Sequence, residues 1–141
     1  MAQVQVTGHA KDKYKQNVKA RVHSFAADAG TEHGGADAAP SPHELLLGSL
    51  GACTAITLEM YAQRKGWDLQ EVTIDLQEEE IDDPNQPGKK ATKITREIAV
   101  HGNLTQDQVD GLKAIADKCP IHKILAGSVL INTEIKPLTN V

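Results

Sequence analysis

Aromatic residues are scarce in this chain of 141 residues: they make up 3% of it, so aliphatic side chains have to build most of the core. No basic stripe or tail stands out and the formal charge is −4, which argues against nucleic acid and anionic membrane as partners. No secretory signal opens the sequence, and no unbroken apolar run approaches the ~18 residues of a membrane span. We therefore expect a cytoplasmic protein that does not cross a membrane.

Cysteine is also rare, since the chain has two, Cys53 and Cys119. Two cysteines exclude a disulfide-rich scaffold. In a reducing compartment such a pair is more often catalytic or metal-binding than a structural bridge. The length suits one domain, and we take residues 1–141 as a single domain with a core small enough to gain from oligomerisation.

Alternating apolar residues predict several strands, separated by a Gly/Ala/Asp-rich loop over 26–40 and a turn-rich stretch over 82–90. The two middle strands flank that turn-rich stretch and should form a hairpin across 71–101. Strands grouped before and between a few helices indicate an α+β fold rather than a parallel βαβ fold. The predicted strands are 3–7, 14–23, 71–80, 92–101 and a last one at 128–136.

The strongest local signal predicts a long helix. Ser41, Pro42 and Glu44 form a capping box with proline at the first helical position, and Gly66 should end the helix after about Lys65. Its first half is apolar or small on every side, which is typical of a helix buried all round. A chain this short struggles to bury such a helix alone. We therefore expect a homodimer in which a second copy covers it.

A second capping box at Thr105–Gln108 starts another helix, whose apolar side includes Cys119. Pro120 ends or kinks that helix, and residues 122–125 form a short helical turn. Both cysteines thus face the core. Each could simply be a small buried hydrophobic residue, because free cysteine is among the most buried residue types.

A reactive cysteine must be a thiolate, and burial favours the neutral thiol, so a nearby cation is required. Arg96 is the best candidate, because it shares strand parity with Ile94 and Ile98 and so points to the apolar face. An arginine there needs an anionic partner or an open cleft, and pairing with a carboxylate is the alternative explanation for it.

Two acid–base groups lie near the start of the long helix. At ~100° per residue, Glu44 lies about 180° and His43 about 280° around the helix from Cys53. Either would reach the cysteine only through a kink or across a subunit interface. Capping suffices to explain Glu44, and His43 could be an ordinary first-turn surface residue. His122 offers a further alternative, a zinc site with both cysteines, for which a Cys-x-x-His pair is a weak signal.

The segments SPHELLLGSLGACTAITLEMYAQRKGW, ITREIAVHGNL and IADKCPIHKIL resemble the OsmC/Ohr family of hydroperoxide-reducing proteins, from about residue 30 to the C-terminus. The apolar helix with GACT, combined with the later DKCP, is specific to it. The resemblance implies an OsmC-like fold, with antiparallel sheets around long central helices, and an intertwined homodimer with each active site near the subunit interface. It also implies that Cys53 attacks peroxide and that Cys119 resolves the product.

The family's best-known peroxidases carry a catalytic glutamate ten residues before the first cysteine, where this chain has His43 and then Glu44. They also carry an N-terminal arginine, and the corresponding TGHAKDK has none. The family's Arg–Glu pair therefore does not transfer, and Arg96 takes its place as candidate.

The sequence thus predicts a thiol peroxidase with Cys53, Cys119, Arg96, His43 and Glu44 as catalytic candidates. Cys53 would form a sulfenic acid, Cys119 would convert it to a disulfide, and an external dithiol would reduce the disulfide. Aliphatic lining favours an organic hydroperoxide, and the chemistry needs no metal or organic cofactor. The rival hypothesis is a non-catalytic module that binds a small apolar ligand beside passive thiols.

Overall fold

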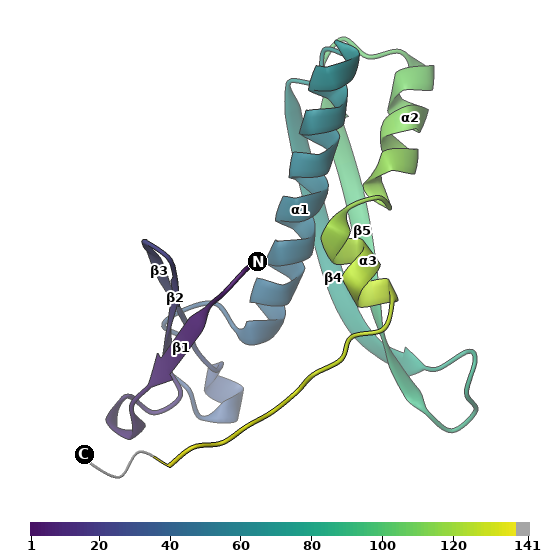
Figure 1. Cartoon of the computed structure of the whole chain (residues 1–141). Coiled ribbons are helices and arrows are strands. Elements are labelled where there is room, and N and C mark those ends of the chain that lie inside the picture. The colour runs from purple at the N-terminus through teal and green to yellow at the C-terminus, as the bar shows by residue number, and fades with distance from the viewer. Residues whose placement is uncertain (138–141) are drawn as a thin grey trace.

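A computed structural model describes residues 1–137 and shows an α+β architecture in which helices pack on antiparallel strands (Figure 1). The first part is a three-stranded sheet with two short 3₁₀ turns, and the second is a long helix against a long hairpin, with two further helices. The elements are β1 (Gln5–Gly8), η1 (Ala10–Asp12), β2 (Gln16–Ala20), β3 (His23–Ala27), η2 (Thr31–His33), α1 (Pro42–Lys65), β4 (Glu71–Asp82), β5 (Lys90–His101), α2 (Gln106–Ala116) and α3 (Pro120–Ala126).

Helix α1 begins and ends where its local signals predict. The Ser41 hydroxyl accepts a hydrogen bond from the Glu44 backbone N–H at 3.2 Å, and the Glu44 carboxylate accepts one from the Ser41 N–H at 2.9 Å. Gly66 ends the helix in the left-handed conformation, with φ of 73°. Both ends are fixed by contacts within a few residues, which is why sequence alone could place them.

A single chain does not bury α1 on every side, as its short length led us to expect. One side is buried, along the residues Leu50, Gly51, Thr54, Leu58 and Ala62. On another side Leu46, Ile56 and Met60 expose 40%, 51% and 57% of their surface. The reason is that one hairpin and two short helices cannot surround a helix of 24 residues.

The hairpin of β4 and β5 is confirmed, and its register pairs Leu76 with Arg96 and Ile74 with Ile98. Exposed and half-buried residues alternate along both strands, so one face packs against α1 and the other meets solvent. Gly51 allows α1 to approach β4 closely, because a Cβ built on it would lie 2.8 Å from Leu76 Cδ1. The main core lies beside this contact and centres on Leu58, Ala62, Leu112 and Ala116.

The predicted strand over 14–23 is instead two strands, β2 and β3, joined by a turn at Arg21 and Val22. Arg21 adopts a positive φ of 56°. Two-residue hairpin turns favour Gly, Asn or Asp at such positions, so this turn carries no recognisable signal. The loop that the sequence predicts over 26–40 therefore starts only after Ala27, where β3 ends.

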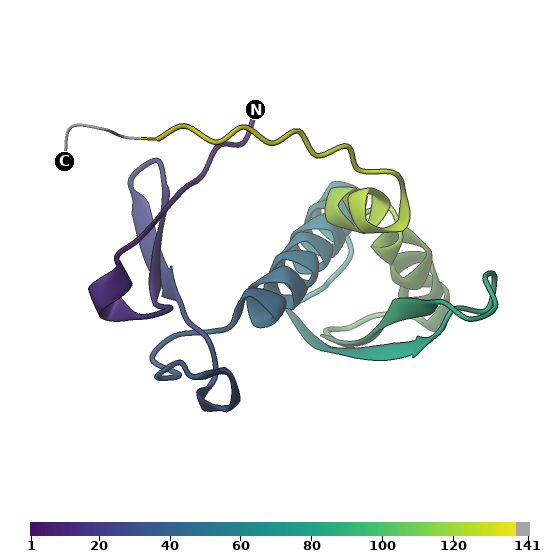
Figure 2. The same cartoon turned by 90° about the horizontal axis from the view of Figure 1, so that it is seen from below.

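The predicted strand at 128–136 is absent, because within residues 1–137 this segment pairs with nothing. It runs as extended chain from α3 toward the three-stranded sheet (Figures 1 and 2). Leu130 and Ile135 are 98% and 94% exposed. The alternating pattern is real, but a strand also needs a neighbour to satisfy its backbone hydrogen bonds.

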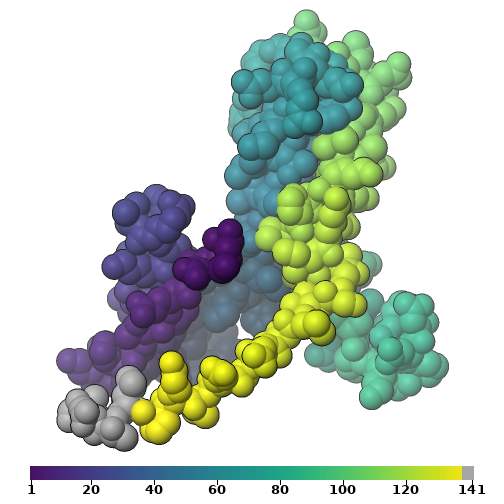
Figure 3. All heavy atoms as spheres, in the orientation of Figure 1, coloured from purple at the N-terminus to yellow at the C-terminus, as the bar shows by residue number. Residues whose placement is uncertain are grey.

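The chain exposes much more surface than a compact monomer. Its accessible area is 11260 Å², whereas a compact protein of 15.2 kDa exposes roughly 7,100 Å². Figure 3 shows why: the three-stranded sheet, the C-terminal segment and the tip of the hairpin project away from the helical part. By length and composition alone, α1 is also apolar enough to cross a membrane, a test that a core helix of a protein outside the membrane passes as well.

Candidate active site

The two cysteines come from different elements and meet at the packing of α3 on α1. Cys53 lies about three turns into α1 and is half-buried, and Cys119 lies between α2 and α3 and is fully buried. Both are free cysteines, and each influences the pKa of the other. The sequence suggested that Cys119 lies on the same helix as Leu112 and Ala116. In the structure α2 ends at Ala116, and Cys119 caps the start of α3 instead.

The surroundings of the two sulfurs favour a negative charge on Cys119 over one on Cys53. Burial is the largest influence on its pKa and acts to raise it, but donors outweigh burial and the pKa of Cys119 falls below its ordinary value. The donors are the Cys53 thiol, the His122 and Ile121 backbone N–H groups and the Thr54 hydroxyl. The His122 N–H lies 3.4 Å from the Cys119 sulfur.

Cys53 shifts the opposite way. Burial raises the pKa of the Cys53 thiol, and its hydrogen bond to Cys119 raises it further, because losing the proton would break that bond and bring two negative charges together. Of the two cysteines, Cys119 is therefore the one that loses its proton more readily.

Arg96 stands beside this pair and is held by three partners. Its side chain is 12% exposed, and it donates to Thr54 Oγ1 at 3.0 Å, Asp117 Oδ1 at 2.9 Å and His122 Nδ1 at 3.1 Å. Arginine has no acceptor, so His122 Nδ1 must accept and its ring proton is on Nε2. Among the hydrogen bonds of residues 1–137, Arg96 thus reaches the cysteines through its partners and not directly.

His43 and Glu44 lie at the N-terminal end of α1, away from the cysteines. Glu44 is occupied by the capping box. His43 Nδ1 lies 2.9 Å from a carboxylate oxygen of Glu78, which ties the start of α1 to β4. Both remain proposals as catalytic residues, and the structure gives each of them a structural contact instead of a cysteine partner.

Two small cavities meet at Arg96. One, of about 230 Å³, is lined by Leu58, Arg96, Ile98, Val100, Val109, Leu112 and Lys113. The other, of about 360 Å³, is lined by Leu50, Thr92, Ile94, Arg96, His122, Leu125 and Ala126. The wall of the first is mainly aliphatic, that of the second is equally polar and apolar, and the Arg96 side chain is the polar group that both share.

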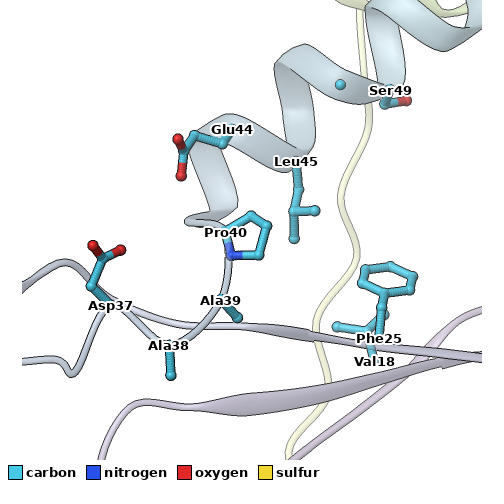
Figure 4. Close-up of a pocket in the computed structure, with 10 residues that line it drawn as sticks. Val18, Phe25, Asp37, Ala38, Ala39, Pro40, Glu44, Leu45 and Ser49 are labelled. Atoms are coloured by element: carbon cyan, nitrogen blue, oxygen red, sulfur yellow. The ribbon is translucent and has the colours of Figure 1, made fainter.

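A larger hollow, about 840 Å³, lies elsewhere, between the start of α1 and the three-stranded sheet (Figure 4). There Leu45 projects from α1 toward Val18 and Phe25, and Glu44 lies on the rim. Neither cysteine lines it. It is an open apolar surface and not part of the cysteine site.

Among residues 1–137, no group of three or more His, Cys, Asp or Glu side chains is arranged to hold a metal ion. The alternative zinc set of Cys53, Cys119 and His122 is therefore not assembled. The His122 ring accepts from Arg96 instead.

Sequence reasoning missed Thr54 and Asp117 and named His122 only as a zinc ligand. Thr54 follows Cys53 directly, yet its partner Arg96 is 42 residues away, and Asp117 is 21 residues from the same arginine. The one available signal was that a buried arginine requires a carboxylate partner, and Asp117 lies two residues before Cys119.

Comparison with known proteins gives one consistent result. The family model described as OsmC-like protein matches residues 34–134. No curated protein matches the chain in sequence.

Solved structures share the fold at low sequence identity. An OsmC-like protein from Mycoplasma pneumoniae is 16% identical with a TM-score of 0.74, and the match covers 90% of this chain and 88% of that one. The organic hydroperoxide resistance protein OsmC from Legionella pneumophila is 18% identical, with a TM-score of 0.67 and 90% of each chain covered. The organic hydroperoxide resistance protein OhrB of Bacillus subtilis is 19% identical, with a TM-score of 0.61, covering 90% of this chain and 91% of that one. The chain therefore belongs to the OsmC-like protein family.

Proposed function

We propose that this protein is a thiol-dependent peroxidase that reduces organic hydroperoxides, with Cys53 as the attacking residue and Cys119 as the resolving residue. The observation that carries the proposal is the pairing of two free cysteines that influence each other's pKa, one half-buried and the other fully buried with a lowered pKa. Neighbours of the same fold that are named organic hydroperoxide resistance proteins support it.

The first step oxidises Cys53. The Cys119 thiolate accepts the Cys53 proton while the Cys53 sulfur attacks the outer oxygen of the hydroperoxide. A sulfur–oxygen bond forms, the O–O bond breaks, and the alkoxide leaves with a proton as the alcohol. Cys53 is then a sulfenic acid and Cys119 is again a thiolate. The pair supplies its own base, so the chemistry does not need His43 or Glu44 beside it.

The second step closes the disulfide. The Cys119 thiolate attacks the Cys53 sulfur, the sulfur–sulfur bond forms, and hydroxide leaves and becomes water. An external dithiol then reduces the disulfide by thiol–disulfide exchange and is itself oxidised. No step draws on a metal or an organic cofactor. The mainly aliphatic cavity of about 230 Å³ beside Arg96 suits the alkyl part of an organic hydroperoxide, because burial of apolar surface is favourable.

The active protein is a homodimer in this proposal. Leu46, Cys53, Ile56 and Met60 recur at spacings of seven, three and four and so share one side of α1. The three apolar members are exposed in a single chain. A second copy packed on this side would bury them and close the solvent-facing side of Cys53. The same packing would bury α1, which fits a cytoplasmic protein better than a membrane-spanning one.

Trapping of the sulfenic acid separates the peroxidase from a passive ligand-binding module. In Cys119→Ser the resolving thiol is gone, so one equivalent of cumene hydroperoxide should leave a sulfenic acid on Cys53 that dimedone labels in full. The wild type should give little label, because the disulfide forms first. The readout is the intact mass of the non-reduced protein, with Cys53→Ser as the matched control. Absence of label in Cys119→Ser would refute the peroxidase.

A further inference from the structure

Cys119 is fully buried at the start of α3, although α3 itself has little apolar anchoring. The helix has seven residues, none of them is buried, and both Ile124 and Leu125 are exposed. A helix this short has little stability of its own and depends on tertiary contacts. Apolar packing along α3 therefore contributes little to holding Cys119 in its buried position.

Polar contacts from Arg96 hold both flanks of the Cys119 turn, which is the segment 117–122. The guanidinium donates to Asp117 Oδ1, two residues before the cysteine, at 2.9 Å and to His122 Nδ1, three residues after it, at 3.1 Å. The His122 backbone N–H in turn donates to the Cys119 sulfur at 3.4 Å. His122 thus holds the sulfur with its backbone while Arg96 holds its ring, and this ties the position of the sulfur to that of the guanidinium.

The same guanidinium is bound to α1 beside the other cysteine. Arg96 donates to the hydroxyl of Thr54, the residue that follows Cys53, at 3.0 Å. Its partner across the hairpin, Leu76, lies against Gly51, where a Cβ would be 2.8 Å from Leu76 Cδ1. Arg96 stands on a regular strand of twelve residues and its side chain is 12% exposed, so it has little room to move.

We propose that Arg96 is a positioning residue whose three hydrogen bonds clamp the Cys119 turn onto α1 beside Cys53 and so raise the effective concentration of one thiol at the other. A guanidinium suits this role because it presents five N–H donors in a rigid planar fork. Since the turn is in place before the disulfide forms, closing the disulfide loses less conformational entropy. Supplying a positive charge is a different role, which an ammonium group could also fill.

The proposal rests on the proposed function in taking Cys53 and Cys119 as the disulfide pair, and its test uses glutathione instead of peroxide. Oxidised glutathione accepts two electrons from the two thiols and leaves as two reduced molecules while the Cys53–Cys119 bond forms. The equilibrium constant of this exchange, in molar units, is the effective concentration of the two thiols. It is measured on the full-length protein by acid quenching and intact mass over a range of glutathione ratios.

Arg96→Gln should lower this equilibrium constant by at least about tenfold, because the turn is no longer held in place. Arg96→Lys keeps the charge but lacks the fork, so its constant should stay within about threefold of that of Arg96→Gln. Lys93→Gln is the matched control. It removes a positive charge from an exposed position on the same strand and should leave the constant within about twofold of wild type. Full recovery in Arg96→Lys would show that the charge suffices and would overturn the clamp.

Substitutions at the half-buried His122 keep the proposal testable if changes at the buried Arg96 prevent folding. His122→Leu removes the acceptor ring and should lower the constant by at least about fivefold. His122→Asn keeps an acceptor near the position of Nδ1 and should return the constant to within about threefold of wild type. In the Arg96→Gln background His122→Leu should add little, because both changes break the same link. An unchanged constant in His122→Leu, or additive losses in the double variant, would overturn the clamp.

The outcomes separate the clamp from the peroxidase. A wild type that forms no Cys53–Cys119 disulfide with oxidised glutathione would refute both. Constants in the predicted order, together with no consumption of organic hydroperoxide, would support the clamp and count against the peroxidase alone.

Discussion

Replacement of Cys53 by serine is expected to lower the rate of organic hydroperoxide consumption by at least about 1,000-fold. A serine hydroxyl at this position is neither ionised at neutral pH nor able to form the sulfenic acid on which the cycle depends. The buried Cys119 does not replace it, because Cys119 is fully covered and Cys53 is the half-exposed member of the pair. Stopped-flow measurement of cumene hydroperoxide consumption, with a dithiol in excess, gives the rate directly.

Cys119→Ser is the informative comparison for that experiment. It keeps the attacking sulfur but removes the thiolate that accepts its proton and resolves the product. We expect a slowed first turnover followed by arrest, in contrast to the absence of any turnover in Cys53→Ser. Undiminished consumption in Cys53→Ser would reject Cys53 as the attacking residue, and equal loss with no first turnover in both variants would reject the division of roles.

Replacement of Ile56 by glutamate should convert the protein from a dimer to a monomer, with a dissociation constant raised by at least about 100-fold. Ile56 is 51% exposed in the single chain and lies between Cys53 and Met60 on the uncovered side of α1. A charge there would be buried without a partner in any dimer that covers this side. The loss of the partner also opens the cysteine site to water, so peroxidase activity should fall with dimer content.

Sedimentation velocity over a range of concentrations measures the dimer, and peroxide consumption on the same samples measures its link to activity. Thr73→Glu is the control, because Thr73 lies on the exposed face of β4 and a charge there stays in water. The account predicts a wild-type dimer and an unchanged Thr73→Glu dimer. A monomeric wild type with full activity would contradict the proposed role of the second copy, while leaving the cysteine chemistry intact.

Local signals account for the parts of the fold that the sequence predicts well. The ends of α1 and the start of α2 follow from capping boxes whose members are three residues apart. The hairpin of β4 and β5 follows from two alternating segments around a polar turn. Each of these features is decided by neighbours along the chain, so one sequence suffices to find them.

Features that depend on distant or absent partners were not predictable. The turn at Arg21 has no favoured turn residue, and the segment at 128–136 has a strand pattern without a strand to pair with. The candidate site likewise combines features that are visible in the sequence with contacts between distant residues that are not. The cysteines stood out as the two in the sequence and a family resemblance implied their roles, whereas the contacts of Arg96 with Thr54 and Asp117 join residues far apart in the chain.

The most direct test of the central claim is to map the disulfide in wild-type protein treated with one equivalent of organic hydroperoxide. Proteolysis without reduction, followed by mass spectrometry, should yield a linked pair of peptides containing Cys53 and Cys119. Mixed isotope-labelled and unlabelled protein should show that the link lies within one chain. Stoichiometric loss of peroxide with both thiols still free, or with Cys119 linked only to a second chain, would contradict the contact on which the mechanism depends.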